Sequence, residues 1–236
     1  MKKVLSFVAV AAAMLVAGNA NAQLSVNAGY MSTAFNASTE YTLANTVTKH
    51  DTSISMGGFY VGGSYNVELM GGLGVAPGIY FNYAGKKEVK TNNIPLIGEV
   101  TTTSTTKMMN INIPILIDYK LTFGDDFAIF AFVGPDIVFG INANSKVVTK
   151  SGSTENTYEN DLYKKEDGEN AVDMTRLDLG LMVGAGLQFN NFRLEAGYEL
   201  GLLNRAGEKE YTDSFGGKTT NNNSFNRFFV GVGYAF

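Results

Sequence analysis

Nine charged residues recur at alternating positions inside otherwise apolar segments. A line of carboxylates and guanidinium groups on one face of paired strands could form a path for ions or protons. The same residues could instead be a packed set of ion pairs, because buried charges must be paired whatever the function. Which reading holds depends on the elements that position them. The nine residues are Glu68, Asp118, Asp136, Arg176, Asp178, Arg193, Glu195, Glu199 and Arg227.

The single histidine is a second candidate for chemistry. His50 lies beside Asp51 and close to Ser53, and some lipid hydrolases use a Ser–His pair. Nucleophilic catalysis requires a base that is held by a third group in fixed geometry. A polar tract that is expected to form a loop does not supply that geometry. We therefore expect a solvated histidine, and we predict no catalytic residue and no enzyme activity.

An acidic stretch between residues 155 and 169 is the third candidate. Its carboxylates could bind Ca²⁺ or bridge divalent cations on lipopolysaccharide. It lacks the spaced Asp/Asn and Gly pattern of an EF-hand loop, and Lys164 and Lys165 interrupt it. We expect a solvated loop, and we predict no metal or cofactor site anywhere in the chain. The acidic residues are Glu155, Glu159, Asp161, Glu166, Asp167 and Glu169.

The first 22 residues are typical of a secretory signal peptide. Lys2 and Lys3 precede an apolar run, and Ala20 and Ala22 flank Asn21 in a small-x-small cleavage site. The apolar run is shorter than the roughly 20 residues that a membrane-spanning helix needs. We expect cleavage after Ala22 and a single domain from 23 to 236. Removing the two lysines changes the formal net charge from −4 to −6, and this mild acidity gives no reason to expect a nucleic-acid partner. The chain contains no cysteine, which excludes disulfides and a lipid-anchored cysteine.

Alternation with a period of two determines the expected class of fold. In the last segment Phe228, Val230 and Val232 share one face, whereas Arg227, Gly231 and Gly233 share the other. Seven further segments alternate in the same way, and together they predict an all-β protein with eight antiparallel strands. The predicted strands are 24–30, 59–68, 74–83, 109–121, 127–141, 176–189, 192–202 and 227–236.

The apolar face is expected to point outward, toward lipid. Glycine recurs on the polar face, where a narrow interior needs space for long side chains. Aromatic residues cluster near strand ends, as they do at membrane interfaces. Links 69–73, 122–126 and 190–191 are short, whereas links 36–53, 84–106, 142–174 and 203–224 are long and polar. This alternation is typical of periplasmic turns and extracellular loops. We therefore predict an eight-stranded antiparallel up-and-down transmembrane β-barrel with both termini in the periplasm.

Three prolines lie inside predicted strands of this closed barrel. Pro77, Pro114 and Pro135 cannot donate a ladder hydrogen bond, and a closed barrel has no free edge on which to place them. We expect β-bulges that locally break the ladder at these positions.

Several of these strands resemble a known family. The matching segments are 73–80 (LGVAPGIY), 111–117 (INIPILI), 130–135 (FAFVGP), 177–187 and 193–198 (RLEAGY), followed by the phenylalanine-rich last strand. In this order they are similar to the outer membrane protein β-barrel domain family, which includes PorT-like proteins. The resemblance covers most of the chain from Leu73 to Phe236. It implies the cell outer membrane and, for some members, a part in protein secretion, and it transfers no catalytic motif.

The expected function follows from this barrel. Eight strands leave an interior only wide enough for side chains, so the nine charged residues are expected to form a packed polar plug. We expect a structural or interaction barrel, secretion-associated or adhesive, with long extracellular loops. Its expected partners are outer-membrane lipid or lipopolysaccharide and an extracellular or secretion-system protein, and the barrel is expected to be a monomer. The alternatives are a narrow porin-like pore for small solutes and a lipid-modifying enzyme of the outer membrane.

Overall fold

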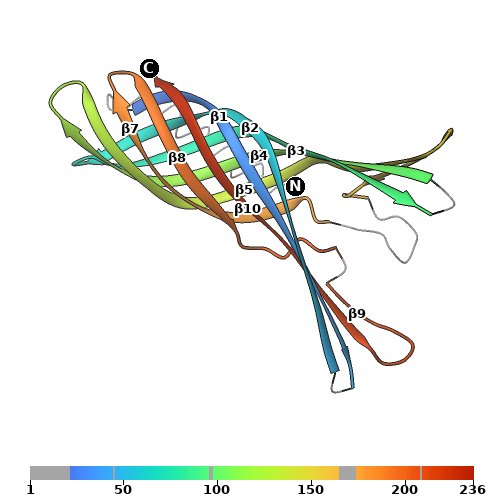
Figure 1. Cartoon of the computed structure of the whole chain (residues 1–236). Coiled ribbons are helices and arrows are strands. Elements are labelled where there is room, and N and C mark those ends of the chain that lie inside the picture. The colour runs from blue at the N-terminus through green and yellow to red at the C-terminus, as the bar shows by residue number, and fades with distance from the viewer. Residues whose placement is uncertain (1–21, 45, 96–97, 165–173, 208) are drawn as a thin grey trace.

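The computed structural model describes residues 22–44, 46–95, 98–164, 174–207 and 209–236, and the expected signal peptide lies outside them except for Ala22. Eight antiparallel strands close into a ring in the order β1-β2-β3-β4-β5-β7-β8-β10, and β10 pairs back to β1 (Figure 1). The predicted eight-stranded up-and-down barrel is thus confirmed. The ring consists of β1 (Ala22–Leu43), β2 (Thr46–Met70), β3 (Leu73–Ile94), β4 (Gly98–Phe123), β5 (Phe127–Ser151), β7 (Leu177–Phe189), β8 (Phe192–Gly201) and β10 (Lys218–Ala235).

The barrel wall is apolar outside and polar inside, as the alternation predicts. Val232 on the outer face of β10 is 63% exposed, whereas Arg227 on the inner face of the same strand is 1% exposed. A water-soluble barrel would show the opposite distribution, because burying an unpaired charge in a protein interior is costly. The outward face therefore suits a hydrocarbon environment. No helix in the described part of the chain is long and apolar enough to cross a membrane.

One end of the barrel carries the three short turns, and we call it the turn end. Gly71 and Gly72 join β2 to β3 with positive φ values of 57° and 84°, and Asn190 has a φ of 53° in the link from β7 to β8. The positive φ angles suit a tight hairpin connection. The C-terminal end of β10 lies at this same end (Figure 1).

The opposite end carries two β-sheet arms, which correct the prediction of long loops there. Strands β1 and β2 stay paired as far as Leu43 and Thr46, and β3 and β4 as far as Ile94 and Gly98. The short strands β6 (Thr154–Asp161) and β9 (Glu210–Thr212), which the sequence analysis missed, add to these extensions. We call β9-β10-β1-β2 beyond the wall the first arm and β3-β4-β5-β6 the second arm (Figure 1). The polar tract 101–106 is therefore strand, because neighbouring strands supply its backbone partners.

The three prolines interrupt the ladder but do not form the expected bulges. The β2–β3 ladder lacks the two pairs that would include residues 76–77, and the register on both sides is unchanged. The same holds at Pro114 between β3 and β4 and at Pro135 between β4 and β5. In each case the missing backbone N–H of the proline would face the preceding strand, so only the ladder with that strand is interrupted. Register shifts occur elsewhere, between Glu68 and Met70 and beside Met109 and Asn110.

Candidate functional site: the barrel lumen

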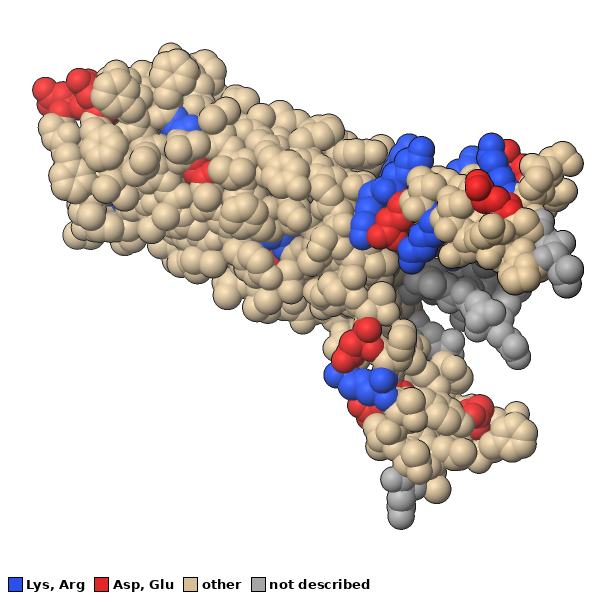
Figure 2. Space-filling model, in the orientation of Figure 1, with Lys and Arg blue, Asp and Glu red and all other residues tan. Residues whose placement is uncertain are grey.

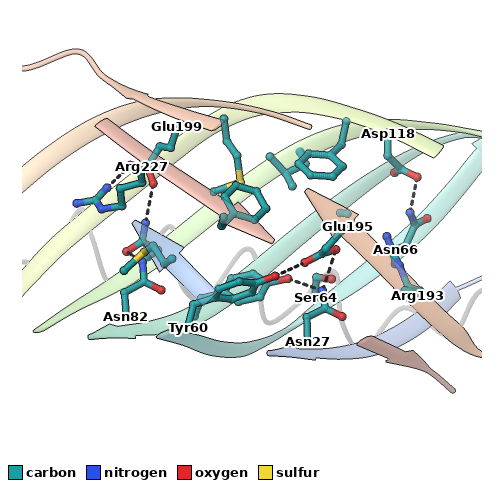
Figure 3. A pocket seen from close by; sticks show the side chains of 18 residues that line it. Asn27, Tyr60, Ser64, Asn66, Asn82, Asp118, Arg193, Glu195, Glu199 and Arg227 are labelled. Atoms are coloured by element: carbon teal, nitrogen blue, oxygen red, sulfur yellow. Dashed lines mark hydrogen bonds and ion pairs between the residues drawn. The ribbon is translucent and has the colours of Figure 1, made fainter. Parts of the chain in front are cut away.

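The lumen contains a cavity of about 60 Å³ between the turn end and mid-height. One water needs about 10–15 Å³ on this measure, so the cavity is large enough for roughly four waters. Figure 3 shows the labelled side chains converging on it from several strands. The polar groups that line it are Asn27, Tyr60, Ser64, Asn66, Tyr80, Asn82, Asn112, Asp118, Arg193, Glu195, Glu199 and Arg227.

The deeper polar cluster is centred on Asn112 of β4. Its amide nitrogen donates to a carboxylate oxygen of Asp136 and, at 3.3 Å, to Oε2 of Glu199. Its carbonyl oxygen accepts a 2.7 Å bond from Asn82. Arg227 of β10 forms an ion pair with Glu199, and both side chains are almost completely buried. Five strands are thus joined across the lumen by one hydrogen-bonded network.

A second polar cluster lies closer to the turn end. Glu195 accepts a 3.0 Å bond from the Tyr60 hydroxyl and a 3.4 Å bond from Asn27, whose amide also donates to Tyr80 at 3.1 Å. Arg193 packs over the Phe130 ring, with its guanidinium carbon 4.2 Å from the ring centre. This packing supplies a cation–π contact.

An aromatic layer separates parts of this polar interior. The rings of Phe132 and Phe229 lie 6.3 Å apart, and Tyr60 meets Phe229 edge-on at 5.6 Å. Lumen-facing glycines make room for these rings. A Cβ at Gly184 would collide with Phe132, and its contact with the carbonyl of Ala196 would be only 2.6 Å. The lumen is therefore less uniformly polar than predicted, and its glycines accommodate aromatic rings as well as charged side chains.

Three short segments, 161–164, 174–176 and 203–206, contribute buried residues at the arm end of the lumen, and we call them the outer cap. Arg205 is fully buried there. Its guanidinium donates to the carbonyl of Thr175 at 2.8 and 3.0 Å and to the Tyr163 hydroxyl at 3.1 Å. It also lies 3.8 Å from a carboxylate oxygen of Asp178 and 4.7 Å from the centre of the Phe225 ring. Arg205 therefore connects Tyr163 and Thr175 of the outer cap to Asp178 on the barrel wall.

The structure brings together most of the nine charged residues, with two exceptions. Glu68 is exposed at the turn end, where it accepts a bond from the backbone N–H of Gly72. Arg176 is half-buried at the arm end and donates to the carbonyls of Gly140 and Ile141. Arg205 was not among the residues predicted from the sequence, because a lone arginine in a polar link carries no periodicity.

The lumen retains unpaired polar atoms and contains more carboxyl groups than guanidinium groups. Five carboxylates face three arginines there, since Asp118, Asp136, Asp178, Glu195 and Glu199 are buried and Arg193, Arg205 and Arg227 are the cations. Buried atoms without a protein partner include Oδ1 of Asn27 and of Asp118 and two guanidinium nitrogens of Arg227. Since these residues line the cavity, a few waters there would satisfy both donors and acceptors.

The histidine candidate is not held in a catalytic arrangement with its neighbours. His50 lies on β2, and its Nε2 is 3.4 Å from the Thr52 hydroxyl. Asp51 and Ser53 project from the opposite face of the strand, because side chains alternate, and Ser53 donates to Asn36 at 2.9 Å. The predicted absence of a catalytic residue remains a prediction.

The acidic stretch corrects a second expectation of a loop. Its first part forms β6, where Glu155 pairs with Lys150 at 2.9 Å and Glu159 with Lys146 at 3.9 Å. Asp161 lies 3.8 Å from Lys164. Glu166, Asp167 and Glu169 lie outside the described residues. Within the described residues no group of three or more acidic, histidine or cysteine side chains could hold a metal ion.

Comparison with known proteins gives one family match and several similar solved structures. The profile of the outer membrane protein beta-barrel domain family matches residues 16–207. Among solved structures the chain is similar to OprG of Pseudomonas aeruginosa, with 11% identity over 93% of this chain and 98% of that one and a TM-score of 0.47. It is also similar to Ail, the attachment invasion locus protein of Yersinia pestis, with 15% identity over 92% and 99% and a TM-score of 0.33. No curated protein sequence matches this chain significantly.

Proposed function

This chain belongs to the outer membrane protein beta-barrel domain family, and we propose that it acts in the cell outer membrane as a sealed, non-enzymatic interaction barrel. Its two arms hold a partner protein outside the cell, either an extracellular protein or a component of a secretion system. The barrel itself works as a monomer and anchors the arms.

The observation that carries this proposal is the free strand edges of the arms. The β2–β3 ladder ends at Gly57 and Gly85, and beyond these residues β2 and β3 belong to different arms (Figure 1). Within the described part of the chain, residues 46–56 and 86–94 therefore each present one edge without a neighbouring strand. An exposed edge is a template for strand addition by an extended segment of another chain. Folded arms of this length position such edges well beyond the membrane surface.

The packing of the lumen supports a sealed barrel over the narrow pore. The Asn112 cluster and the aromatic layer lie inside the wall, and Arg205 is buried in the outer cap at the arm end. Opening a path would require breaking the Arg205 contacts with Thr175 and Asp178. Buried hydrogen bonds to charged groups are among the costlier contacts to remove. We therefore propose a structural role for the lumen charges.

The proposal includes an orientation. The arms point out of the cell and the short turns and termini face the periplasm, because outer-membrane barrels combine short periplasmic turns with long external connections. Export depends on removal of residues 1–22. A single cysteine at Ser153, in the turn from β5 to β6, should react with an impermeant thiol reagent in whole cells, whereas one at Asn190 should not. The chain has no cysteine of its own, so each label is unambiguous. The reverse labelling pattern would contradict the orientation.

Photo-crosslinking in intact cells tests the partner. A crosslinking amino acid at Thr52 or Val89 lies on a free edge, whereas one at Thr103 lies on β4, between β3 and β5 in the second arm. We expect protein adducts from the two edge positions and few from Thr103. Equal yields from all three positions, or none, would reject strand addition as the mode of binding.

A further inference from the structure

We propose that the base of the second arm binds the phosphate groups of an outer-leaflet glycolipid through Lys87, Lys107 and Lys146. The proposal rests on the orientation given above, with the arms outside the cell. It adds a lipid site, distinct from the strand edges that hold a protein partner.

The height of this site relative to the membrane follows from two tyrosines. The Tyr83 hydroxyl lies 3.3 Å from the position that a Cβ would occupy at Gly85, and the Tyr30 hydroxyl lies 3.1 Å from that position at Gly57. Both hydroxyls thus point away from the apolar wall and toward the arms. Tyrosines at a membrane interface place the ring in the apolar region and the hydroxyl at its wet edge. The boundary of the hydrocarbon region is therefore close to Gly57 and Gly85.

The three lysines lie directly beyond that boundary on the outer face. Lys107 of β4 is opposite Gly85 on β3, one outward-facing position above the level of Tyr83 and Met109. At the next level Thr105 is opposite Lys87 on β3 and Lys146 on β5. Opposed residues lie about 5 Å apart and alternate residues of one strand about 7 Å apart. The three long side chains can therefore converge on one group above Thr105.

Little negative charge competes for these lysines. All three are exposed, and neither Lys87 nor Lys107 has an ion-pair partner within the described residues. Lys146 lies 3.9 Å from Glu159, a weak contact between exposed groups. Figure 2 shows positive side chains, with some acidic ones among them, where the uncharged wall meets the second arm.

The lysine cluster has no counterpart at the same height on the first arm. At the matching height on the first arm, Ala34 of β1 is opposite Ser55 of β2 and Asn226 of β10, and none of these is charged. A ring of lysines serving only solubility would not be restricted to three adjacent strands. The asymmetry indicates a local anionic ligand at the membrane surface.

The chemistry of the ligand is that of a phosphate monoester. Such a group carries about −1.5 to −2 at neutral pH, whereas the phosphodiester of a common phospholipid carries one negative charge. Three ammonium groups on one face match the higher charge. In the outer leaflet of the outer membrane, this chemistry is that of the lipid A phosphates of lipopolysaccharide.

Native mass spectrometry of the full-length mature chain in non-ionic detergent measures binding of diphosphoryl lipid A directly. The test variant is K87Q/K107Q/K146Q. The matched control is K49Q/K150Q/K218Q, whose lysines are each held in an ion pair at 2.9–3.2 Å. Each lysine near an anionic surface contributes roughly fivefold to affinity, so the test variant should bind about 100-fold more weakly. The control and the K87R/K107R/K146R variant should bind like the parent.

Two outcomes overturn this proposal. Unchanged lipid A affinity of the test variant would reject the lysine site. Equal affinity of the parent for phosphatidylglycerol and for diphosphoryl lipid A would reject the phosphate-monoester ligand. A failed orientation is detected separately, because the lysine site would still bind lipid A while the cysteine at Ser153 stayed unlabelled in whole cells.

Discussion

Removing Arg227 should destabilise the barrel more than any other single change of charge in the lumen. Arg227 is the cation that contacts Glu199, and Asp136 shares the Asn112 donor with Glu199. The Arg227→Met variant keeps a similar volume but leaves two neighbouring carboxylates without a cation. Breaking a buried pair from one side typically costs about 3–5 kcal/mol.

The cavity places the expected value at the lower end of that range. Both Glu199 and Arg227 line the cavity of about 60 Å³, so roughly four waters could solvate the carboxylate that remains. We therefore expect a loss of about 3 kcal/mol in the free energy of unfolding. In the double variant Arg227→Met/Glu199→Gln the unpaired charge is also removed. The double variant should recover about 2 kcal/mol of this loss, within the range of coupling between residues in contact.

Urea unfolding from phosphatidylcholine vesicles, followed by the heat-modifiable gel shift of folded barrels, measures these values. The chain contains no tryptophan, so the gel shift is a better signal than intrinsic fluorescence. Lys150→Met is the control, because its side chain is 60% exposed in a pair with Glu155 and should cost less than about 1 kcal/mol. If Arg227→Met cost no more than Lys150→Met, the lumen charges would be solvated and the packed interior would be refuted.

Three further changes test other parts of the molecule. Arg205→Ala should release the outer cap, so that protease added to whole cells cleaves the protein faster while the heat-modifiable shift of the barrel remains. Unchanged cleavage would contradict the role of Arg205 in holding the outer cap. Gly184→Val should overpack the aromatic layer and cost about 1–3 kcal/mol in urea unfolding, and adding Phe132→Ala should relieve part of that loss, because the ring is one of the two colliding groups. Backbone N–H groups lower the pKa of Asp213, and the Asp213 hydrogen bond raises the pKa of Tyr41. The Tyr41–Asp213 hydrogen bond should therefore protect the backbone amides of the turn 213–217 against hydrogen exchange at neutral pH. This protection should be lost as the pH falls below about 4 or rises above about 10. In Asp213→Ala the exchange rate of these amides should show no additional increase in acid.

The barrel wall was predictable because its evidence is local. In a strand, adjacent side chains face opposite sides, so Val232 and Arg227 reveal their environments from their positions in the chain. The inward placement of Asp118, Asp136, Asp178, Glu195 and Glu199 followed from the same alternation, and their burial confirms it. The match of the family profile to residues 16–207 agrees with the resemblance drawn from the strand motifs.

The arms were not predictable in the same way, because their strands lack an apolar face. The tract 101–106 consists of Thr and Ser, and beyond the membrane both faces of such a strand are solvated. Polarity then says nothing of backbone pairing. The sequence therefore suggested loops, whereas strands β3 and β5 on either side supply the hydrogen-bonding partners.

The sequence by itself determined which residues line the wall and which line the lumen, because a period of two is written into the order of the residues. Only the tertiary structure decided the partners across the lumen. Arg227 and Glu199 lie on neighbouring strands, but Asn112 contacts Glu199 from three strands away around the ring. Arg205 enters from a link with no periodicity and meets Asp178 at the arm end. These contacts depend on ring closure and strand register, which bring distant positions to the same height in one narrow interior.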